Sequence, residues 1–251
     1  MRSEKITFEG AFGDQLSARV DQPPDEPRSY ALFAHCFTCS KNLKVVSNIS
    51  KTLTKHGIGI FRFDFTGLGE SEGDFADTNF SSNIEDLIAA AEHMASHYRA
   101  PAILIGHSLG GAAVLQAAQK IPNSKAVATI GAPANPDHVK KNFGAQLDKI
   151  EQKGIATVTL AGRDFTIKKQ FIDDLEATHM DEKIQSLDRA LMIFHSPVDN
   201  TVGIENAAHI YKKAKHPKSF VSLDDANHLL TKEEDSIYLA EVLAAWADRY
   251  F

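Results

Sequence analysis

Ala102-Ile-Leu-Ile-Gly-His-Ser108-Leu-Gly-Gly-Ala-Ala-Val-Leu-Gln-Ala-Ala-Gln119 is the stretch of sequence from which we predict the fold. Its first four residues are apolar, as in a buried strand, and the residues after position 109 are rich in alanine, as in a helix. Between them, Gly106 and Gly110 flank the serine in a G-x-S-x-G pattern, whose sharp turn strains the serine backbone and requires small neighbours. The turn places the Ser108 hydroxyl at the positive end of a helix. We therefore predict that Ser108 is a nucleophile; the alternative is a serine that only caps the helix.

The composition is that of an ordinary globular chain of 251 residues, with 43% hydrophobic and 24% charged residues. The formal net charge of -6 and the lack of a basic stripe argue against nucleic acid as a partner. The N-terminal residues lack the apolar core of a signal peptide, and no apolar run approaches the roughly 20 residues that span a bilayer. Two cysteines do not make a disulfide framework, so we expect a cytoplasmic, reducing location and no membrane partner.

Strand-like and helix-like segments alternate along most of the chain, which predicts an α/β fold. We expect strands at residues 5–9, 15–21, 29–34, 59–65, 102–105, 125–130, 190–194 and 219–223. We expect helices at residues 45–56, 81–97, 109 onward, 204–214 and 233–250. This order predicts a mostly parallel, doubly wound sheet of about eight strands with helices on both faces, in a single domain of residues 1–251.

The alternation is interrupted by a long insertion at residues 134–188. It contains a charged helical run at 137–152, a hairpin formed by 155–160 and 165–167 around a turn at 161–164, and an amphipathic run at 168–177. We interpret this insertion as a small lid at the rim of the sheet. The alternative is an elaborate crossover without a gating role.

A serine hydroxyl needs a base to take its proton and an acid to orient that base. Of the 11 histidines, His228 follows the last predicted strand, in a loop that is able to return over Ser108. Asp199 follows the preceding strand, so we predict that it orients His228. Asp224 and Asp225 are rival acids, but they lie on the way out of the strand that leads to His228 and more simply support its loop.

The developing oxyanion needs two backbone donors. We predict that these are the amide of Leu109, directly after the nucleophile, and the amide of Phe37, in the loop after the strand at 29–34. The Phe37 ring is also a candidate for the wall of the acyl pocket. His35 and His107, beside these two amides, are the remaining candidates for oxyanion or substrate binding. We expect no metal and no cofactor.

Several motifs resemble the landmarks of the α/β-hydrolase superfamily: residues 106–111 (Gly-His-Ser-Leu-Gly-Gly), 64–71 (Asp-Phe-Thr-Gly-Leu-Gly-Glu-Ser) and 195–199 (His-Ser-Pro-Val-Asp). The order Ser108, Asp199, His228 is also the order of that superfamily. The loop at 35–42 (His-Cys-Phe-Thr-Cys-Ser-Lys-Asn) is similar to the His-Gly-Phe-Thr-Gly loop of feruloyl and cinnamoyl esterases. The chain further resembles the hydrolase module that some bacteria fuse to an OsmC-type domain, and we expect the hydrolase module alone. The resemblance implies a serine hydrolase that cleaves a carboxylic ester, or thioester, of a small to medium acyl group through an acyl-enzyme intermediate.

Two cysteines stand where those esterases have glycines, and they form a C-x-x-C motif, Cys36 and Cys39. The simplest interpretation is two small apolar side chains packed under the oxyanion loop. The second interpretation is a redox pair, which leads to the alternative function of a dithiol redox or stress-responsive protein. The third interpretation is a metal site that includes His35. If the motif is a redox pair, we expect oxidation to disturb the oxyanion loop and reductant to restore activity.

Residues 64–73 contain a glycine pattern, but they lack the Lys-Ser/Thr of a phosphate-binding loop. We interpret this segment as a structural turn near the active site, in which Asp64 ties the loop down.

Overall fold

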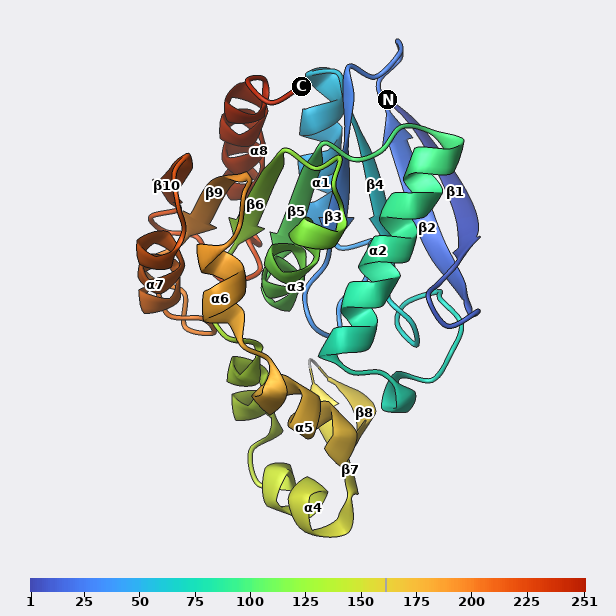
Figure 1. Ribbon diagram of the computed structural model, residues 1–251, viewed down its shortest axis with the longest axis vertical. Helices are drawn as coiled ribbons and strands as arrows, with labels where there is room; N and C mark the ends of the chain where they lie inside the picture. Colours follow the sequence, from blue (N-terminus) through green and yellow to red (C-terminus); the bar gives the residue numbers. More distant parts are fainter. Residues whose placement is uncertain (161) are drawn as a thin grey trace.

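The computed structural model describes residues 1–160 and 162–251. Within them, one sheet contains eight strands in the order β1-β2-β4-β3-β5-β6-β9-β10, and β2 runs antiparallel to β1 and β4 while the other neighbours are parallel (Figure 1). The predicted α/β fold with a mostly parallel sheet is therefore confirmed. In chain order the strands of this sheet are β1 (Arg2–Glu9), β2 (Gln15–Gln22), β3 (Ser29–Ala34), β4 (Ile58–Phe63), β5 (Ile103–His107), β6 (Ala126–Ile130), β9 (Ala190–His195) and β10 (Lys218–Ser222).

Helices cover both faces of the sheet (Figure 1). On one face lie α1 (Lys44–Lys55) and α8 (Glu233–Ala247), and on the other lie α2 (Phe80–His97), α3 (Leu109–Ala117) and α7 (Glu205–Lys213). Two short 3-10 helices are also present: η1 (Phe75–Asp77) lies between β4 and α2 in the chain, and η2 (Ala118–Lys120) directly follows α3. In the part of the chain that the structure describes, no helix is both long and apolar enough to cross a membrane.

The central strands read as continuous apolar runs because both of their faces are buried. In β3, Ala31 and Phe33 pack toward α1 and α8, while Leu32 and Ala34 pack toward α2 and α3. Successive side chains of a strand point to opposite faces, so one strand contributes to both cores. Burial of each large side chain contributes roughly 1.5–3 kcal/mol, and the rigid sheet that results fixes the strand ends where the site lies.

Residues 134–188 form the insertion, of which residues 134–177 extend beyond the carboxyl ends of the parallel strands (Figure 1). Their elements are the 3-10 helix η3 (Pro136–Phe143), α4 (Gln146–Lys153), the hairpin β7 (Ile155–Leu160) and β8 (Arg163–Lys168), α5 (Lys169–Ala177) and α6 (Met180–Gln185). We refer to residues 134–177 as the lid segment, because α6 packs against α3 and α7 in the main helical layer.

The insertion at residues 134–188 differs from its prediction in two places. The single helix predicted at 137–152 is wrong: Gly144 has a φ of 49°, which interrupts the run and separates η3 from α4. The helix α6 was not predicted, because six residues give too few turns for a periodic pattern. The predicted hairpin is confirmed, although residue 161 of its predicted turn lies outside the described residues.

Aromatic and polar contacts fasten the lid segment to the body of the protein. The ring of Phe37 lies 5.5 Å from that of Phe171 in α5 and 5.7 Å from that of Phe75 in η1. Ser81, in the first turn of α2, donates from its amide and hydroxyl to Asp174 of α5 at 2.8 and 2.6 Å. The lid segment is therefore packed onto the same edge of the sheet as the loop that contains Phe37.

Candidate active site

Ser108 occupies a strained turn between β5 and α3, with φ 55° and ψ -124°. A side chain at Gly106 would place its Cβ 2.2 Å from the carbonyl oxygen of Gly110, and one at Gly110 would place its Cβ 2.4 Å from the carbonyl oxygen of Ala34. Only glycine fits at both positions, which explains the G-x-S-x-G pattern. The Ser108 amide donates to the Ile130 carbonyl at 2.8 Å, so the turn is also held by β6. The serine side chain is thereby presented at the edge of the sheet.

Three residues that were predicted separately along the chain meet at this edge. The Nε2 atom of His228 lies 2.9 Å from Ser108 Oγ, and its Nδ1 atom lies 2.7 Å from Asp199 Oδ2. Because Asp199 accepts at Nδ1, the ring carries its proton there and Nε2 is free to accept the proton of the serine hydroxyl. The rival acids Asp224 and Asp225 are exposed.

The second carboxylate oxygen of Asp199 is occupied by its own loop. Oδ1 accepts hydrogen bonds from the amides of Thr201 at 2.8 Å and Val202 at 2.9 Å. Burial raises the pKa of Asp199, but the hydrogen bonds from His228 and from these amides outweigh burial and keep the pKa below its ordinary value. The carboxylate is therefore charged near neutral pH and fixed in orientation.

His107 and His35 support the site from below and are not among the residues that line its cavity; their role as oxyanion or substrate contacts stays a prediction. The two side chains are buried, at 1% and 2% exposure. His107 Nε2 donates to the His228 carbonyl oxygen at 2.8 Å, and burial, assisted by the nearby His228, lowers its pKa to about 4. His35 Nδ1 donates to the Cys36 carbonyl oxygen at 2.8 Å, and burial lowers the pKa of this ring as well. Both rings are neutral near pH 7 and hold the backbone on either side of Ser108.

A cavity of about 450 Å³ opens above the serine; we call it the reaction cavity. Ser108, His228, Phe37 and Leu109 line it, together with apolar residues from the lid segment such as Leu160. Among the described residues, neither the Phe37 amide nor the Leu109 amide donates to a protein acceptor. These two amides are therefore available to an oxygen atom of a bound molecule.

Comparison with protein families identifies the chain. The family model of the serine aminopeptidases of group S33 (Hydrolase_4) matches residues 26–184. The chain belongs to this family of α/β-hydrolases. A crystal structure of the esterase domain of a Rhodothermus marinus protein is 51% identical, with a TM-score of 0.83, over 100% of this chain and 99% of that one.

Two further relatives match the chain with lower identity or over only part of its length. The structure of Est1E from Butyrivibrio proteoclasticus with bound ferulic acid has a TM-score of 0.78 over 98% of both chains but only 18% identity, so it shows the shared fold alone. The palmitoyl-protein thioesterase ABHD10 of rat mitochondria is 31% identical over 127 residues. That match covers 49% of this chain and 41% of the relative, so the chain spans less than half of that protein's length. The relative matched over its whole length is thus an esterase domain, and the relative matched over part of its length is a thioesterase.

The two cysteines of this hydrolase form a disulfide, with their Cα atoms 5.3 Å apart. The interpretation as two separate packed thiols is therefore wrong, and so is the interpretation as metal ligands, because each sulfur is bonded to the other. Thr38, between them, has a φ of 60°, and the Cys39 amide donates to the Cys36 carbonyl at 3.1 Å. The disulfide is present together with the hydrogen bond between His228 and Ser108, and the expectation that oxidation disturbs this loop and reductant restores activity stays a prediction.

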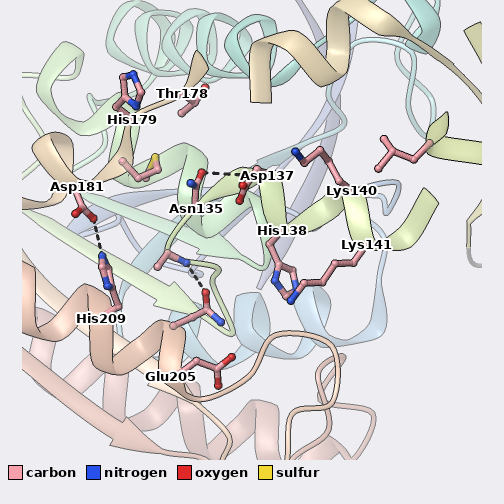
Figure 2. A pocket seen from close by; sticks show the side chains of 14 residues that line it. Asn135, Asp137, His138, Lys140, Lys141, Thr178, His179, Asp181, Glu205 and His209 are labelled. Carbon is pink, nitrogen blue, oxygen red and sulfur yellow. Dashed lines mark hydrogen bonds and ion pairs between the residues drawn. The ribbon is translucent and has the colours of Figure 1, made fainter. Parts of the chain in front are cut away.

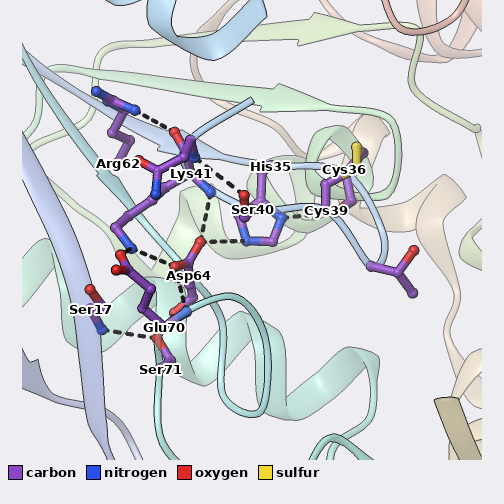
Figure 3. A network of polar contacts seen from close by, with 12 residues as sticks. Ser17, His35, Cys36, Cys39, Ser40, Lys41, Arg62, Asp64, Glu70 and Ser71 are labelled. Carbon is purple, nitrogen blue, oxygen red and sulfur yellow. Dashed lines mark hydrogen bonds and ion pairs between the residues drawn. A yellow bond between two sulfur atoms is a disulfide. The ribbon is translucent and has the colours of Figure 1, made fainter. Parts of the chain in front are cut away.

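A buried ionic network anchors the far end of this loop (Figure 3). Lys41 and Asp64 have fully buried side chains, and Lys41 Nζ lies 2.5 Å from Asp64 Oδ2 and 2.7 Å from Glu70 Oε2. The Lys41 amide donates to Asp64 Oδ1 at 2.6 Å, and the Glu70 amide donates to Oδ2 at 3.0 Å. Hydrogen bonds from Lys41, and then from Lys5, hold the pKa of Glu70 at about 2. Asp64 thus holds the turn at 64–73, as predicted, and it also holds the loop at 35–42. The part that Lys41 has in this ionic network was not predicted.

A second cavity of about 940 Å³ lies beside the first, between η3, α6 and α7 (Figure 2). His138 lines both cavities, and its Nε2 donates to the Thr201 carbonyl at 2.6 Å, so this residue forms the wall between them. The second cavity carries charges of both signs, some of which pair within its wall, such as His209 with Asp181 at 2.6 Å. It therefore favours neither a cationic nor an anionic ligand.

Proposed function

We propose that the chain is a serine hydrolase that cleaves a carboxylic ester, or thioester, of a small to medium acyl group through an acyl-enzyme intermediate. The observation that carries this proposal is the continuous hydrogen-bond chain from Ser108 Oγ through His228 to Asp199, at 2.9 and 2.7 Å. It opens into a cavity with two unpaired backbone amides, and the family supports hydrolase chemistry.

In the proposed reaction, Ser108 Oγ attacks the carbonyl carbon while His228 Nε2 takes the hydroxyl proton. Asp199 stabilises the imidazolium that forms, and the amides of Phe37 and Leu109 donate to the developing oxyanion. His228 then gives its proton to the leaving alcohol or thiol. A water molecule, activated by the same ring, hydrolyses the acyl-enzyme and restores Ser108.

The proposed substrate class follows from the reaction cavity. Its volume of about 450 Å³ and its apolar side chains, including Phe37, Val139 and Leu160, suit an apolar acyl group of modest size. The names of the relatives support either leaving group, because one is an esterase domain and the other a palmitoyl-protein thioesterase. We propose a cytoplasmic location, with the small ester as the only partner that the site requires.

The test compares the wild-type chain with Ser108→Ala and His228→Ala. We expect wild-type protein to release a burst of p-nitrophenol from short-chain p-nitrophenyl esters and to react with a fluorophosphonate probe. Each variant should lose at least about 10³-fold in kcat, and Ser108→Ala should not be labelled by the probe. Full activity in Ser108→Ala would refute the assignment.

Matched oxygen esters and thioesters of one acyl series then separate the two leaving groups by kcat/KM. The alternative function, a dithiol redox protein, has one observation in its favour, the disulfide between Cys36 and Cys39. Thiol titration of fully reduced protein before and after mild peroxide tests it: an unchanged thiol count with intact hydrolysis excludes redox as the main activity.

A further inference from the structure

The disulfide forms part of the wall of the reaction cavity. Cys36 and Cys39 line this cavity together with Ser108 and His228. Their accessibility differs, because Cys36 is 4% exposed whereas Cys39 is partly exposed. Cys39 is therefore the more accessible residue of the pair.

Both ends of the loop are held by contacts that do not depend on the disulfide (Figure 3). On one side, the Cys36 carbonyl accepts from His35 Nδ1 at 2.8 Å, directly after the buried strand β3. On the other side, Lys41 is fixed by Asp64 through its amide and its ammonium group. The sulfur–sulfur bond is thus able to open and close without unfolding of the surrounding structure.

Cys36 lies beside the N-terminus of α3. It lines a further, very small cavity with Leu109 and Gly110, the first two residues of α3. The amides at a helix N-terminus carry a partial positive charge, which stabilises a neighbouring thiolate. A stabilised thiolate departs faster in thiol–disulfide exchange.

We propose that the Cys36–Cys39 disulfide is a thiol-exchange site for low-molecular-weight thiols that enter the reaction cavity. The incoming thiolate attacks Cys39 Sγ and forms a new sulfur–sulfur bond there, while the Cys36–Cys39 bond breaks. Cys36 leaves with the electron pair of that bond and then takes up a proton. Attack by Cys36 on the mixed disulfide reverses the reaction, and attack by a second thiol releases a symmetric disulfide and leaves both cysteines reduced.

This proposal goes beyond the proposed hydrolysis and does not depend on it, because the exchange uses neither Ser108 nor His228. An adduct on Cys39 occupies the cavity and blocks substrate. It also opens the tight turn at Thr38, whose carbonyl accepts from Arg163 Nη2 of the lid segment at 3.0 Å. In a reducing compartment, a persistent disulfide is uncommon and those that form are usually transient and redox-active, which agrees with such a role.

The first experiment traps the intermediate in the full wild-type chain. Oxidised protein is incubated with cysteamine, quenched with iodoacetamide and digested for mass spectrometry. We expect cysteamine on Cys39 and carbamidomethyl on Cys36, and the same products in Ser108→Ala. Prior labelling of Ser108 with a fluorophosphonate should slow the exchange several-fold, because the label fills the cavity. Cysteamine on Cys36, equal rates with the cavity filled, or two free thiols in air-oxidised protein would overturn the proposal.

The second experiment compares Cys36→Ser with Cys39→Ser, each of which leaves one thiol. The thiol of Cys39 should react with 5,5′-dithiobis(2-nitrobenzoate) at least about tenfold faster than the buried thiol of Cys36. Equal rates in the two variants would contradict the proposed direction of attack. Because the readouts are adduct masses and thiol rates, failure here leaves the hydrolase proposal intact, and loss of hydrolysis in Ser108→Ala leaves this proposal intact. Should a variant not fold, the trapping experiment on wild-type protein decides alone.

Discussion

Replacement of Asp199 by asparagine tests the geometry of the proposed site most directly. Asp199 Oδ1 accepts from two backbone amides, those of Thr201 and Val202, and Oδ2 accepts from His228 Nδ1. In Asp199→Asn, the side-chain oxygen must remain at the two amides, since an NH₂ group there would face two donors. The new NH₂ group therefore faces His228, where it has to donate.

This arrangement changes the tautomer of the His228 imidazole. His228 must accept at Nδ1, so its proton moves to Nε2, which then faces Ser108 Oγ as a donor and is unable to take the serine proton. The same change in a serine protease, for which the tautomer argument was developed, lowers kcat about 10⁴-fold. We expect a similar loss here, which corresponds to about 5.4 kcal/mol in activation free energy.

The assay is hydrolysis of a short-chain p-nitrophenyl ester under saturating conditions, with the rate of fluorophosphonate labelling as a second readout. Asp224→Asn and Asp225→Asn are matched controls, because both side chains are exposed; they should retain wild-type kcat. Asp199→Asn should still fold, since the oxygen at the Thr201 and Val202 amides is preserved. A kcat for Asp199→Asn within about tenfold of wild type would refute the reasoning, because the wrong tautomer alone costs far more.

Three further changes probe the frame around the site. Lys41→Met leaves Asp64 charged and buried without its ammonium partner, so we expect a loss of about 3–5 kcal/mol in the free energy of unfolding by urea; a loss below about 1 kcal/mol would show that the pair does not anchor the loop. Burial raises the pKa of Asp21, but its hydrogen bonds outweigh burial and lower it below 3.8. The stabilising contribution of the Asp21 carboxylate is therefore complete above pH 3.8 and is lost as the pH falls through the folded-state pKa. The difference in unfolding free energy between wild type and Asp21→Asn should then shrink on acidification from pH 5 to pH 2. A constant difference would contradict the lowered pKa of Asp21. Gly106→Ala places a Cβ 2.2 Å from the carbonyl oxygen of Gly110. We therefore expect circular dichroism to show an unfolded protein, or fluorophosphonate labelling to show that Ser108 is unreactive. Normal labelling by fluorophosphonate would contradict the need for glycine.

The sequence predicted those parts of the site that lie at strand ends. Ser108 follows β5, Asp199 follows β9 and His228 follows β10, and the carboxyl ends of parallel strands meet at one edge. Their positions were therefore a consequence of topology, which the alternation of strands and helices already indicated. The amides of Phe37 and Leu109 were placed by the same reasoning.

The parts that were missed depend on three-dimensional packing. Whether Cys36 and Cys39 are bonded is decided by the turn at Thr38, whose left-handed backbone has no sequence signal of its own. Lys41 was not singled out from the sequence, because its buried partner Asp64 lies 23 positions away. A lysine at the end of the loop after β3, with an aspartate directly after the next strand, is the signal that points to such a pair.

The lid segment leaves the sheet after β6 and the chain returns at β9, which is the next strand in the sheet. The chain thus leaves and rejoins the sheet at two neighbouring strands. The strand ends that hold Ser108 and Asp199 belong to the rigid eight-stranded sheet and not to the lid segment. Polar contacts, such as those from Arg163 to Thr38 and from His138 to Thr201, and the packing of Phe37 on Phe171 join it to the loops of the reaction cavity. An exchange of this segment for another of different shape and length would therefore change the reaction cavity while Ser108, Asp199 and His228 keep their positions.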